Sequence, residues 1–194
     1  KYACLTTPDE SYHGVVYTDA FGLGGAYITK ATAQLMRDLG SIPAPMNAFI
    51  VGTHLESLHL RIARHIANAQ QVAEYLEAND KIAWVRYPGL KNDPYHALAE
   101  KYMPKGTCGV IAFGIKGDAA KAAEFTDNLK MIAIATHVAD ARSCILHPAS
   151  TTHRQLNDEQ LEAAGVKPEL LRLSCGIEAA EDIIADIEQA LAAV

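Results

Sequence analysis

The sequence predicts an α/β fold in which helices cover one face of a mixed β-sheet. Three observations lead to this prediction. Apolar residues recur at spacings near three and four between Met46 and Asn79, which is the stripe of one or two long amphipathic helices. Short apolar segments typical of strands follow, separated by helical segments. A second amphipathic stripe, between Glu178 and Ala193, predicts a terminal helix.

The segment before the long helices has weaker signals. Residues 1–27 combine glycines and aromatic side chains with little periodicity, so we expect an irregular, docked segment there. A short helix is predicted over residues 28–39, with Gly40 ending it. Pro43 and Pro45 then prevent a helix until about Met46.

The later elements follow from alternation, turn residues and helix caps. Asp118 and Asn157 are expected to cap two helices, and Gln160 completes a capping-box pattern with Asn157. Gly165 is expected to end the second of these helices. The predicted strands are residues 82–87, 107–115, 131–135, 143–147 and 170–174, and the predicted helices are residues 95–102, 118–129, a short one after residue 157, and 178–193.

Composition excludes several classes of protein. A net charge of -6 without a basic stripe argues against nucleic-acid binding, because such binding requires displacement of counterions. The cysteines lie far apart without a CxxC pair, so neither a zinc site nor a disulfide framework is expected, and a cytoplasmic protein with reduced thiols is favoured. The sequence shows neither a membrane-spanning stretch nor a signal peptide. Because residue 1 is lysine, we expect the chain to start inside a longer polypeptide.

Arg172 is the candidate site residue that physical reasoning singles out. It interrupts the apolar segment 170–174, where alternation places it on the same face as Leu170 and Ser174. One interpretation is a side chain extended along an edge strand. The other is a polar pocket in which the guanidinium binds a carboxylate through two parallel hydrogen bonds.

The segment HPASTTH (residues 147–153) follows a predicted strand and predicts a tight turn rich in hydrogen bonds. A structural role is favoured over catalysis, because Ser150, Thr151 and Thr152 can bond to nearby backbone groups.

Two longer segments carry a resemblance to a known family. HPASTTHRQL (147–156) and LLRLSCGIEAAEDIIADIEQAL (170–191) resemble the C-terminal signature of the cysteine/methionine metabolism enzymes, which depend on pyridoxal 5'-phosphate (PLP) and have fold type I. The segments LRIARHIANAQQVAEYL (60–76) and THVADARSC (136–144) extend the match over nearly the whole chain. Within this family, LTTPDESYHGVVY (5–17) is most similar to the sulfhydrylases.

The resemblance implies an organisation and an activity. Residues 1–45 would be the end of the large PLP-binding domain, residues 46–79 the linking helices, and residues 80–194 the two-layer small C-terminal domain. The whole enzyme would replace the acetyl group of O-acetyl-L-homoserine with sulfide or a thiol, giving homocysteine or methionine, and would be a homotetramer. The lysine that holds PLP would lie upstream, so this chain alone would be inactive.

The resemblance also implies site residues. Arg172 matches the arginine that binds the substrate's α-carboxylate, and Thr136 and His137 fall in the same pocket. No catalytic, cofactor-binding or metal-binding residue is expected in this chain. Relatives often have a small polar residue at His137 and a glycine at Ala139.

Other functions stay open at this point. Methionine γ-lyase and cystathionine γ-synthase belong to the same family. A non-catalytic binding or assembly module is a candidate of another class, because the PLP lysine is missing. A cysteine-dependent hydrolase is disfavoured, since no cysteine has a histidine partner in a recognisable motif.

Overall fold

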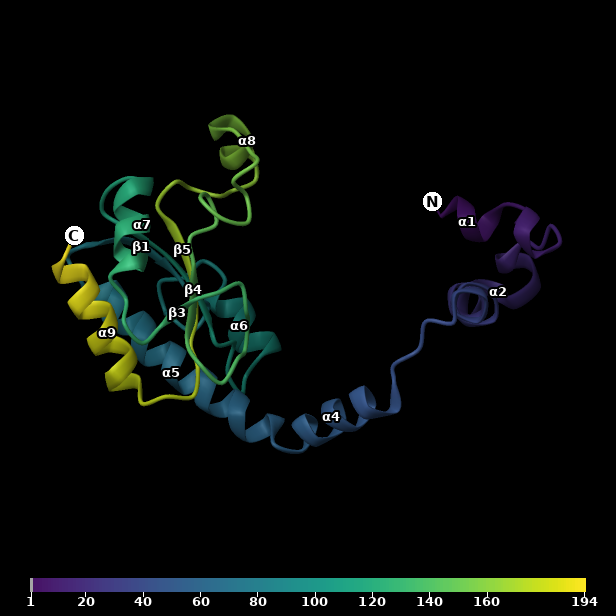
Figure 1. The fold of residues 1–194 in the computed structure, drawn as a ribbon, viewed down its shortest axis with the longest axis horizontal. Helices are drawn as coiled ribbons and strands as arrows, with labels where there is room; N and C mark the ends of the chain where they lie inside the picture. The colour runs from purple at the N-terminus through teal and green to yellow at the C-terminus, as the bar shows by residue number, and fades with distance from the viewer. Residues whose placement is uncertain (1) are drawn as a thin grey trace. The chain divides into compact units, whose positions relative to one another are not determined.

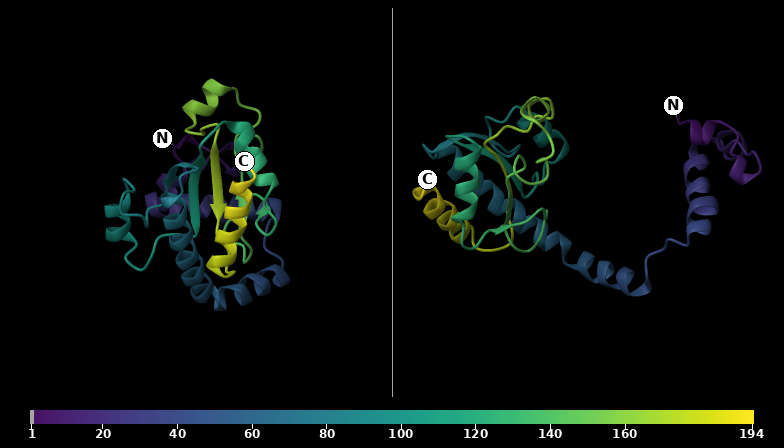
Figure 2. Two further views of the ribbon diagram at one scale, coloured as in Figure 1. Left: turned by 90° about the vertical axis from the view of Figure 1, so that its left-hand side faces the viewer. Right: turned by 45° about the horizontal axis from the view of Figure 1, so that its top comes forward.

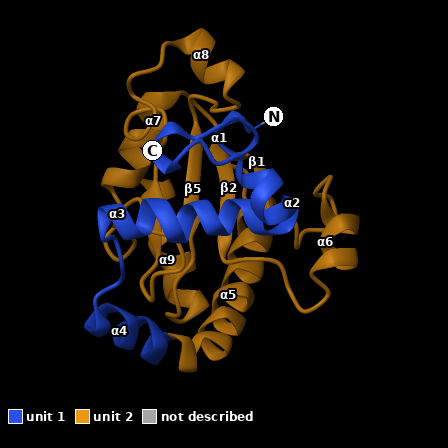
Figure 3. Ribbon diagram, turned by 90° about the vertical axis from the view of Figure 1, so that its right-hand side faces the viewer, with its two compact units in different colours: residues 1–54 blue, residues 55–194 orange. Residues whose placement is uncertain are grey.

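The computed structural model describes residues 2–194. The chain forms two compact units, residues 1–54 and 55–194 (Figure 3). No helix within residues 2–194 combines the length and the apolar character that crossing a membrane requires.

The first unit is helical throughout most of its length. Its elements in order are α1 (Ala3–Thr6), the 3-10 helix η1 (Glu10–Tyr12), α2 (Tyr17–Thr29), the π-helix η2 (Lys30–Met36), α3 (Arg37–Leu39) and α4 (Pro45–Glu56) (Figure 1). The prediction of an irregular segment over residues 1–27 is therefore wrong from Tyr17 onward. Glycines caused the error, because only Gly22 leaves the helical conformation, with φ 68° and ψ 168°. The predicted end at Gly40 is confirmed by its left-handed φ of 69°.

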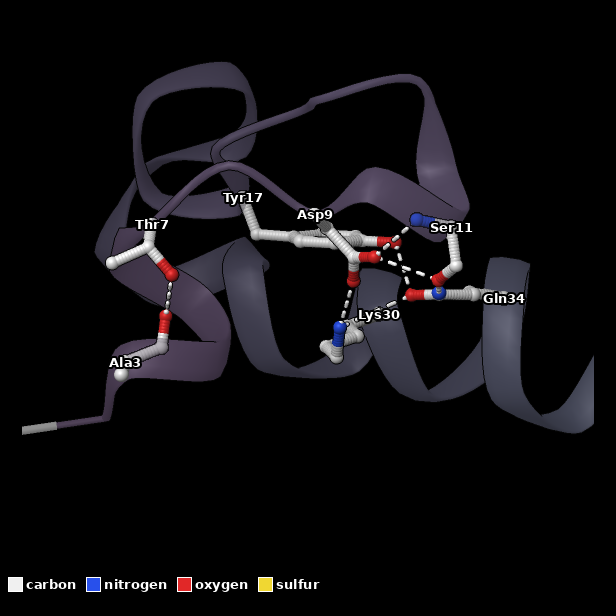
Figure 4. A network of polar contacts seen from close by, with 7 residues as sticks. All are labelled: Ala3, Thr7, Asp9, Ser11, Tyr17, Lys30 and Gln34. Atoms are coloured by element: carbon white, nitrogen blue, oxygen red, sulfur yellow. Dashed lines mark hydrogen bonds and ion pairs between the residues drawn. The ribbon is translucent and has the colours of Figure 1, made fainter.

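A polar network attaches the first residues of this unit to the helix that follows (Figure 4). The buried Tyr17 hydroxyl donates to Gln34 Oε1 at 2.7 Å, and the Gln34 amide donates to Ser11 Oγ. Lys30 forms an ion pair with Asp9, and hydrogen bonds from Lys30 and Ser11 lower the pKa of Asp9 to about 2. Tyr17 thus finds its covering surface within its own unit, whereas Tyr27 stays 72% exposed.

The second unit contains the sheet. Its strands are β1 (Ile82–Arg86), β2 (Val110–Ile115), β3 (Ala133–Ile134), β4 (Cys144–Leu146) and β5 (Leu170–Ser174), in the spatial order β1-β2-β5-β4-β3. The β3–β4 pair is parallel and the other pairs are antiparallel, so the sheet is mixed as predicted. All five predicted strands are confirmed: β5 has the predicted bounds, and the other four are shorter than their predicted ranges.

Three helices cover one face of this sheet. The helices α5 (Leu58–Ala78), α7 (Ala119–Asp127) and α9 (Ala180–Ala192) lie on the same side of it (Figures 1 and 2). Beneath them lies a core built from alternate strand residues: Ile111, Phe113, Ile145, Leu171 and Leu173, each fully buried. The predicted arrangement is confirmed, and the long amphipathic stretch forms two helices, α4 and α5.

The two short helices and the predicted caps complete the unit. The helices α6 (His96–Tyr102) and α8 (Asp158–Ala163) lie on the connections between strands. Asp118 accepts a hydrogen bond from Lys121 N, and Asn157 and Gln160 form the full capping box. These caps are confirmed because they depend only on neighbouring residues.

The sheet face opposite the helices carries Ala112, Gly114 and Arg172. Gly114 has no side chain, so Trp84 packs over it, and the indole N–H donates to Glu169 Oε1 at 2.8 Å. A Cβ on Gly114 would lie 2.4 Å from Trp84 Nε1, so a larger residue here would displace the Trp84 side chain. Lys167 Nζ lies 5.1 Å from the indole ring centroid.

Asp186 on α9 fixes the start of β3 from the helical side. Its carboxylate accepts hydrogen bonds from Lys130 N, Met131 N and Ile132 N, each at 2.9 Å. Burial acts to raise the pKa of Asp186, but the three backbone donors outweigh it, so the pKa lies below its ordinary value.

We expect Asp186→Asn to lower the free energy of unfolding by about 2 kcal/mol, because the amide nitrogen cannot accept from backbone donors. Since the folded pKa is depressed, this contribution is present above the ordinary pKa of 3.8 and is lost as pH falls through the folded value. Urea unfolding at a series of pH values measures both effects. A variant as stable as the wild type at neutral pH, or with the same acid dependence, would contradict this account.

Candidate functional site

Arg172 lies in the middle of the sheet. It pairs with Ala112 of β2 on one side and with Leu146 of β4 on the other, so β5 is a central strand and an edge position does not apply. Its Nη2 donates to the carbonyl oxygen of Thr136 at 3.0 Å. Its Nε is buried and has no hydrogen-bond partner within residues 2–194. A buried N–H without a partner costs free energy, which a purely structural role for Arg172 does not explain.

Thr136 and His137 lie in the connection between β3 and β4. Thr136 contacts Arg172 through its backbone oxygen. The imidazole of His137 is 64% exposed, and its Nδ1 lies 3.9 Å from Asp140 Oδ2. The fold thus brings Arg172 and Thr136 into contact and leaves the side chain of His137 largely in solvent.

The same connection contains a residue in an unusual conformation. Ala139 has φ 57°, the left-handed region that glycine adopts more easily than alanine. Its backbone N–H donates to Ser174 Oγ at 3.0 Å, and Ser174 is buried at the end of β5. The left-handed backbone gives a physical reason why glycine suits this position.

The turn after β5 is held from two sides. From α5, Asn68 Nδ2 donates to the carbonyl oxygens of Gly176 and Glu178 at 2.9 and 2.8 Å. From the other side, Ser143 donates through N and Oγ to the Glu178 carboxylate at 2.6 and 3.0 Å, and Gly176 N donates to Ser143 Oγ. This clamp fixes the direction in which β5 ends. Sequence reasoning did not identify these residues.

The segment at residues 147–153 has the structural role that the sequence favoured. His147 is buried, and its ring nitrogens lie 2.8 Å from Ser150 Oγ and 2.7 Å from the Pro168 carbonyl oxygen. The carbonyl partner requires the proton on Nε2, so Nδ1 accepts from Ser150. Thr151 Oγ1 donates to the His147 carbonyl oxygen at 2.7 Å. Thr152 pairs instead with the ring of His153.

The two buried cysteines are poor candidates for a catalytic nucleophile. Cys144 and Cys175 are both buried, and burial raises the pKa of each, that of Cys175 to about 12. Such thiols are protonated at neutral pH and are poor nucleophiles. In the part of the chain that the structure describes, no group of three His, Cys, Asp or Glu residues could hold a metal ion.

The contacts of Lys30 show whether its amine is suited to covalent linkage with PLP. Its ammonium group is largely buried and is bound by Asp9 and Gln34. The hydrogen bond that Lys30 donates to Asp9 raises the pKa of Lys30, whereas an amine that attacks a carbonyl must be neutral. Lys30 therefore does not fit covalent attachment of the cofactor, while Arg172 fits recognition of a carboxylate.

Comparison with known proteins identifies the family. The model of the Cys/Met metabolism PLP-dependent enzymes matches residues 11–192. The chain is 44% identical to O-acetyl-L-homoserine sulfhydrylase of Leptospira meyeri over 98% of this chain and 45% of that protein. It is 42% identical to O-acetyl-L-homoserine sulfhydrylase 1 of Thermus thermophilus over 99% of this chain and 45% of that protein. It is 39% identical to homocysteine/cysteine synthase of Saccharomyces cerevisiae over 100% of this chain and 46% of that protein.

A solved structure agrees with these sequence matches. It is described as an O-acetylhomoserine (thiol)-lyase of Campylobacter jejuni and carries N'-pyridoxyl-lysine-5'-monophosphate. The match has a TM-score of 0.85 and 37% identity, and it covers 98% of this chain and 45% of that one. The chain spans less than half the length of these relatives. By sequence and by fold, the chain belongs to the Cys/Met metabolism family of PLP-dependent enzymes.

Proposed function

We propose that this chain supplies the substrate-carboxylate site of a PLP-dependent O-acetylhomoserine sulfhydrylase. The enzyme replaces the acetyl group of O-acetyl-L-homoserine with sulfide or a thiol and forms homocysteine or methionine. The observation that carries the proposal is the Arg172 side chain on a central strand, with a buried Nε that lacks a partner within residues 2–194. The names of relatives that are 44% and 42% identical support the choice of reaction.

The role of Arg172 follows from the chemistry of its side chain. A guanidinium group binds a carboxylate through two parallel hydrogen bonds, and such charge-assisted bonds contribute about 1.5–3 kcal/mol. The Thr136 carbonyl holds Nη2 on one side, which leaves the rest of the fork to orient the amino acid. PLP, when bound, supplies the electron sink for the reaction at the substrate's carbon atoms. Arg172 contributes position and charge, and it moves no proton.

Segment 5–17 favours a sulfhydrylase over methionine γ-lyase or cystathionine γ-synthase. This is the stretch whose sequence is most similar to the sulfhydrylases, and in the structure it is an ordered part of the first unit. The ion pair of Asp9 with Lys30 and the bond from Gln34 to Ser11 hold it on the following helix. These contacts support the view that segment 5–17 is a structural feature of the sulfhydrylases.

Product analysis of the PLP-loaded enzyme tests the proposed reaction. We expect homocysteine from O-acetyl-L-homoserine plus sulfide, at a rate at least about tenfold above the thiol released from methionine alone. A preference for methionine without added sulfide would replace the proposal with methionine γ-lyase. Neither product, from an enzyme that holds PLP, would favour a binding or assembly role.

Three further properties belong to the same proposal. We propose that the enzyme is a homotetramer and acts in the cytoplasm, and that this chain alone is inactive. The pairing of Lys30 with Asp9 supports the last point, because it leaves that amine unsuited to holding PLP. The native mass of the enzyme checks the tetramer. Absorbance of the chain after dialysis from PLP checks its inability to retain the cofactor.

A further inference from the structure

The position of Arg172 depends on the path of a loop. The carbonyl oxygen that accepts from Arg172 Nη2 belongs to the backbone of Thr136, in the connection between β3 and β4. Replacing the Thr136 side chain need not move this carbonyl oxygen, but moving the loop backbone would move it. The contacts that hold the loop therefore also determine the position of the Arg172 guanidinium.

The middle of this loop is attached to β5. Ala139 adopts φ 57°, and its N–H donates to Ser174 Oγ at 3.0 Å. Ser174 is 2% exposed and lies two residues after Arg172, so both side chains project from the same face of β5. One strand face thus supplies both the guanidinium and the hydroxyl that holds the loop.

The loop is little covered by other parts of the chain. Residues 136–139 are exposed, and Val138 and Ala139 line an open pocket of about 180 Å³ together with His65 and Ser174. Beyond the pocket, the loop is tied separately, because Ile177 N donates to the Ala141 carbonyl oxygen at 2.9 Å. Because these exposed residues make few dispersion contacts, the hydrogen bond from Ala139 carries more of the restraint at the middle of the loop.

From these contacts we propose that Ser174 is a positioning residue for substrate binding. Its hydroxyl fixes Ala139, the loop then presents the Thr136 carbonyl, and that carbonyl orients the Arg172 guanidinium toward the substrate's carboxylate. This inference rests on the proposed role of Arg172. Ser174 itself touches no substrate, and it acts only through the loop and the arginine.

The test is steady-state kinetics of Ser174→Ala in the PLP-loaded enzyme. We expect the KM for O-acetyl-L-homoserine to rise about tenfold, because small misplacements of a binding group cost large factors in affinity. The kcat should stay within about twofold, and the absorbance of bound PLP should not change. An unchanged KM would overturn the inference.

Three further variants separate positioning from a general loss of stability. Ser174→Thr keeps the hydroxyl, so KM should return to within about twofold of wild type. Thr126→Val removes another buried hydroxyl, on α7, and should leave KM unchanged. Ser174→Cys keeps a weak acceptor and should give an intermediate KM, which preserves the test if the alanine variant does not fold. Equal KM values for Ser174→Thr and Ser174→Ala would contradict a positioning role of the Ser174 hydroxyl.

A double-mutant cycle with Arg172→Lys tests whether Ser174 affects KM through Arg172. If Ser174 acts through Arg172, Ser174→Ala should change KM by less than about twofold when lysine already occupies position 172. Independent, multiplying effects would overturn the inference while leaving the role of Arg172 intact. An unchanged KM in Arg172→Lys alone would instead remove the carboxylate site, and the inference on Ser174 with it.

Discussion

Replacing Arg172 with lysine is expected to raise the KM of the PLP-loaded enzyme for O-acetyl-L-homoserine by about ten- to hundredfold. Lysine keeps the positive charge but loses the planar fork, so the two-point contact with the carboxylate becomes a single contact. The bond from Nη2 to the Thr136 carbonyl is lost as well. We expect kcat to fall too, because an amino acid held at one point places its reacting carbon less accurately.

Arg86→Lys provides the matched control for this variant. Arg86 is an exposed residue at the end of the edge strand β1, so the same chemical change there should leave KM unaltered. The absorbance of bound PLP should be the same in both variants. A KM for Arg172→Lys within about twofold of wild type, which corresponds to only ~0.4 kcal/mol, would rule out the carboxylate assignment.

Gly176→Ala is expected to lower the free energy of unfolding by about 3 kcal/mol. A Cβ at this position would lie 2.2 Å from Glu178 Oε2, 2.5 Å from the Ala141 carbonyl oxygen and 2.5 Å from Arg142 C. Two of these three atoms belong to the backbone and cannot rotate away. Relief would require moving the loop between β3 and β4 or breaking the contacts of Ser143 with Glu178 and Gly176.

Gly165→Ala separates this clash from the effect of backbone conformation. Gly165 has φ 73°, and no heavy atom of the described chain beyond its own neighbours lies within 4 Å of its would-be Cβ. Replacing Gly165 with alanine should lower the free energy of unfolding by only about 1 kcal/mol, because only the left-handed backbone conformation opposes the substitution. Urea unfolding followed by far-UV circular dichroism gives both values. Equal losses in the two variants would show that crowding at Gly176 is relieved without cost.

Local signals explain which parts of the fold the sequence predicts. The periodic apolar residues of α5 and α9, the strand of Arg172, and the capping box of Asn157 and Gln160 are each encoded within a few neighbouring residues. The helix from Tyr17 was missed because its glycines outweighed the long-range contact of Tyr17 with Gln34. Local composition carries no information on such a contact.

The candidate site divides in the same way. Arg172 could be found because a charged residue in an apolar strand is a local anomaly. Its supports could not be found, because the contact of Ala139 with Ser174 joins residues 35 positions apart and that of Asn68 with Glu178 joins residues 110 apart. Serine, asparagine and glutamate are ordinary surface residues in a sequence, and only the fold shows that they converge.

The sole tryptophan of the chain gives the site an intrinsic optical probe. Trp84 packs over Gly114, and its indole N–H is bound to Glu169, immediately before the strand that carries Arg172. Its emission therefore originates on the sheet face of the proposed carboxylate site and is sensitive to movement of the connection that precedes β5. Fluorescence titration with substrate analogues can follow that face in solution without any attached label.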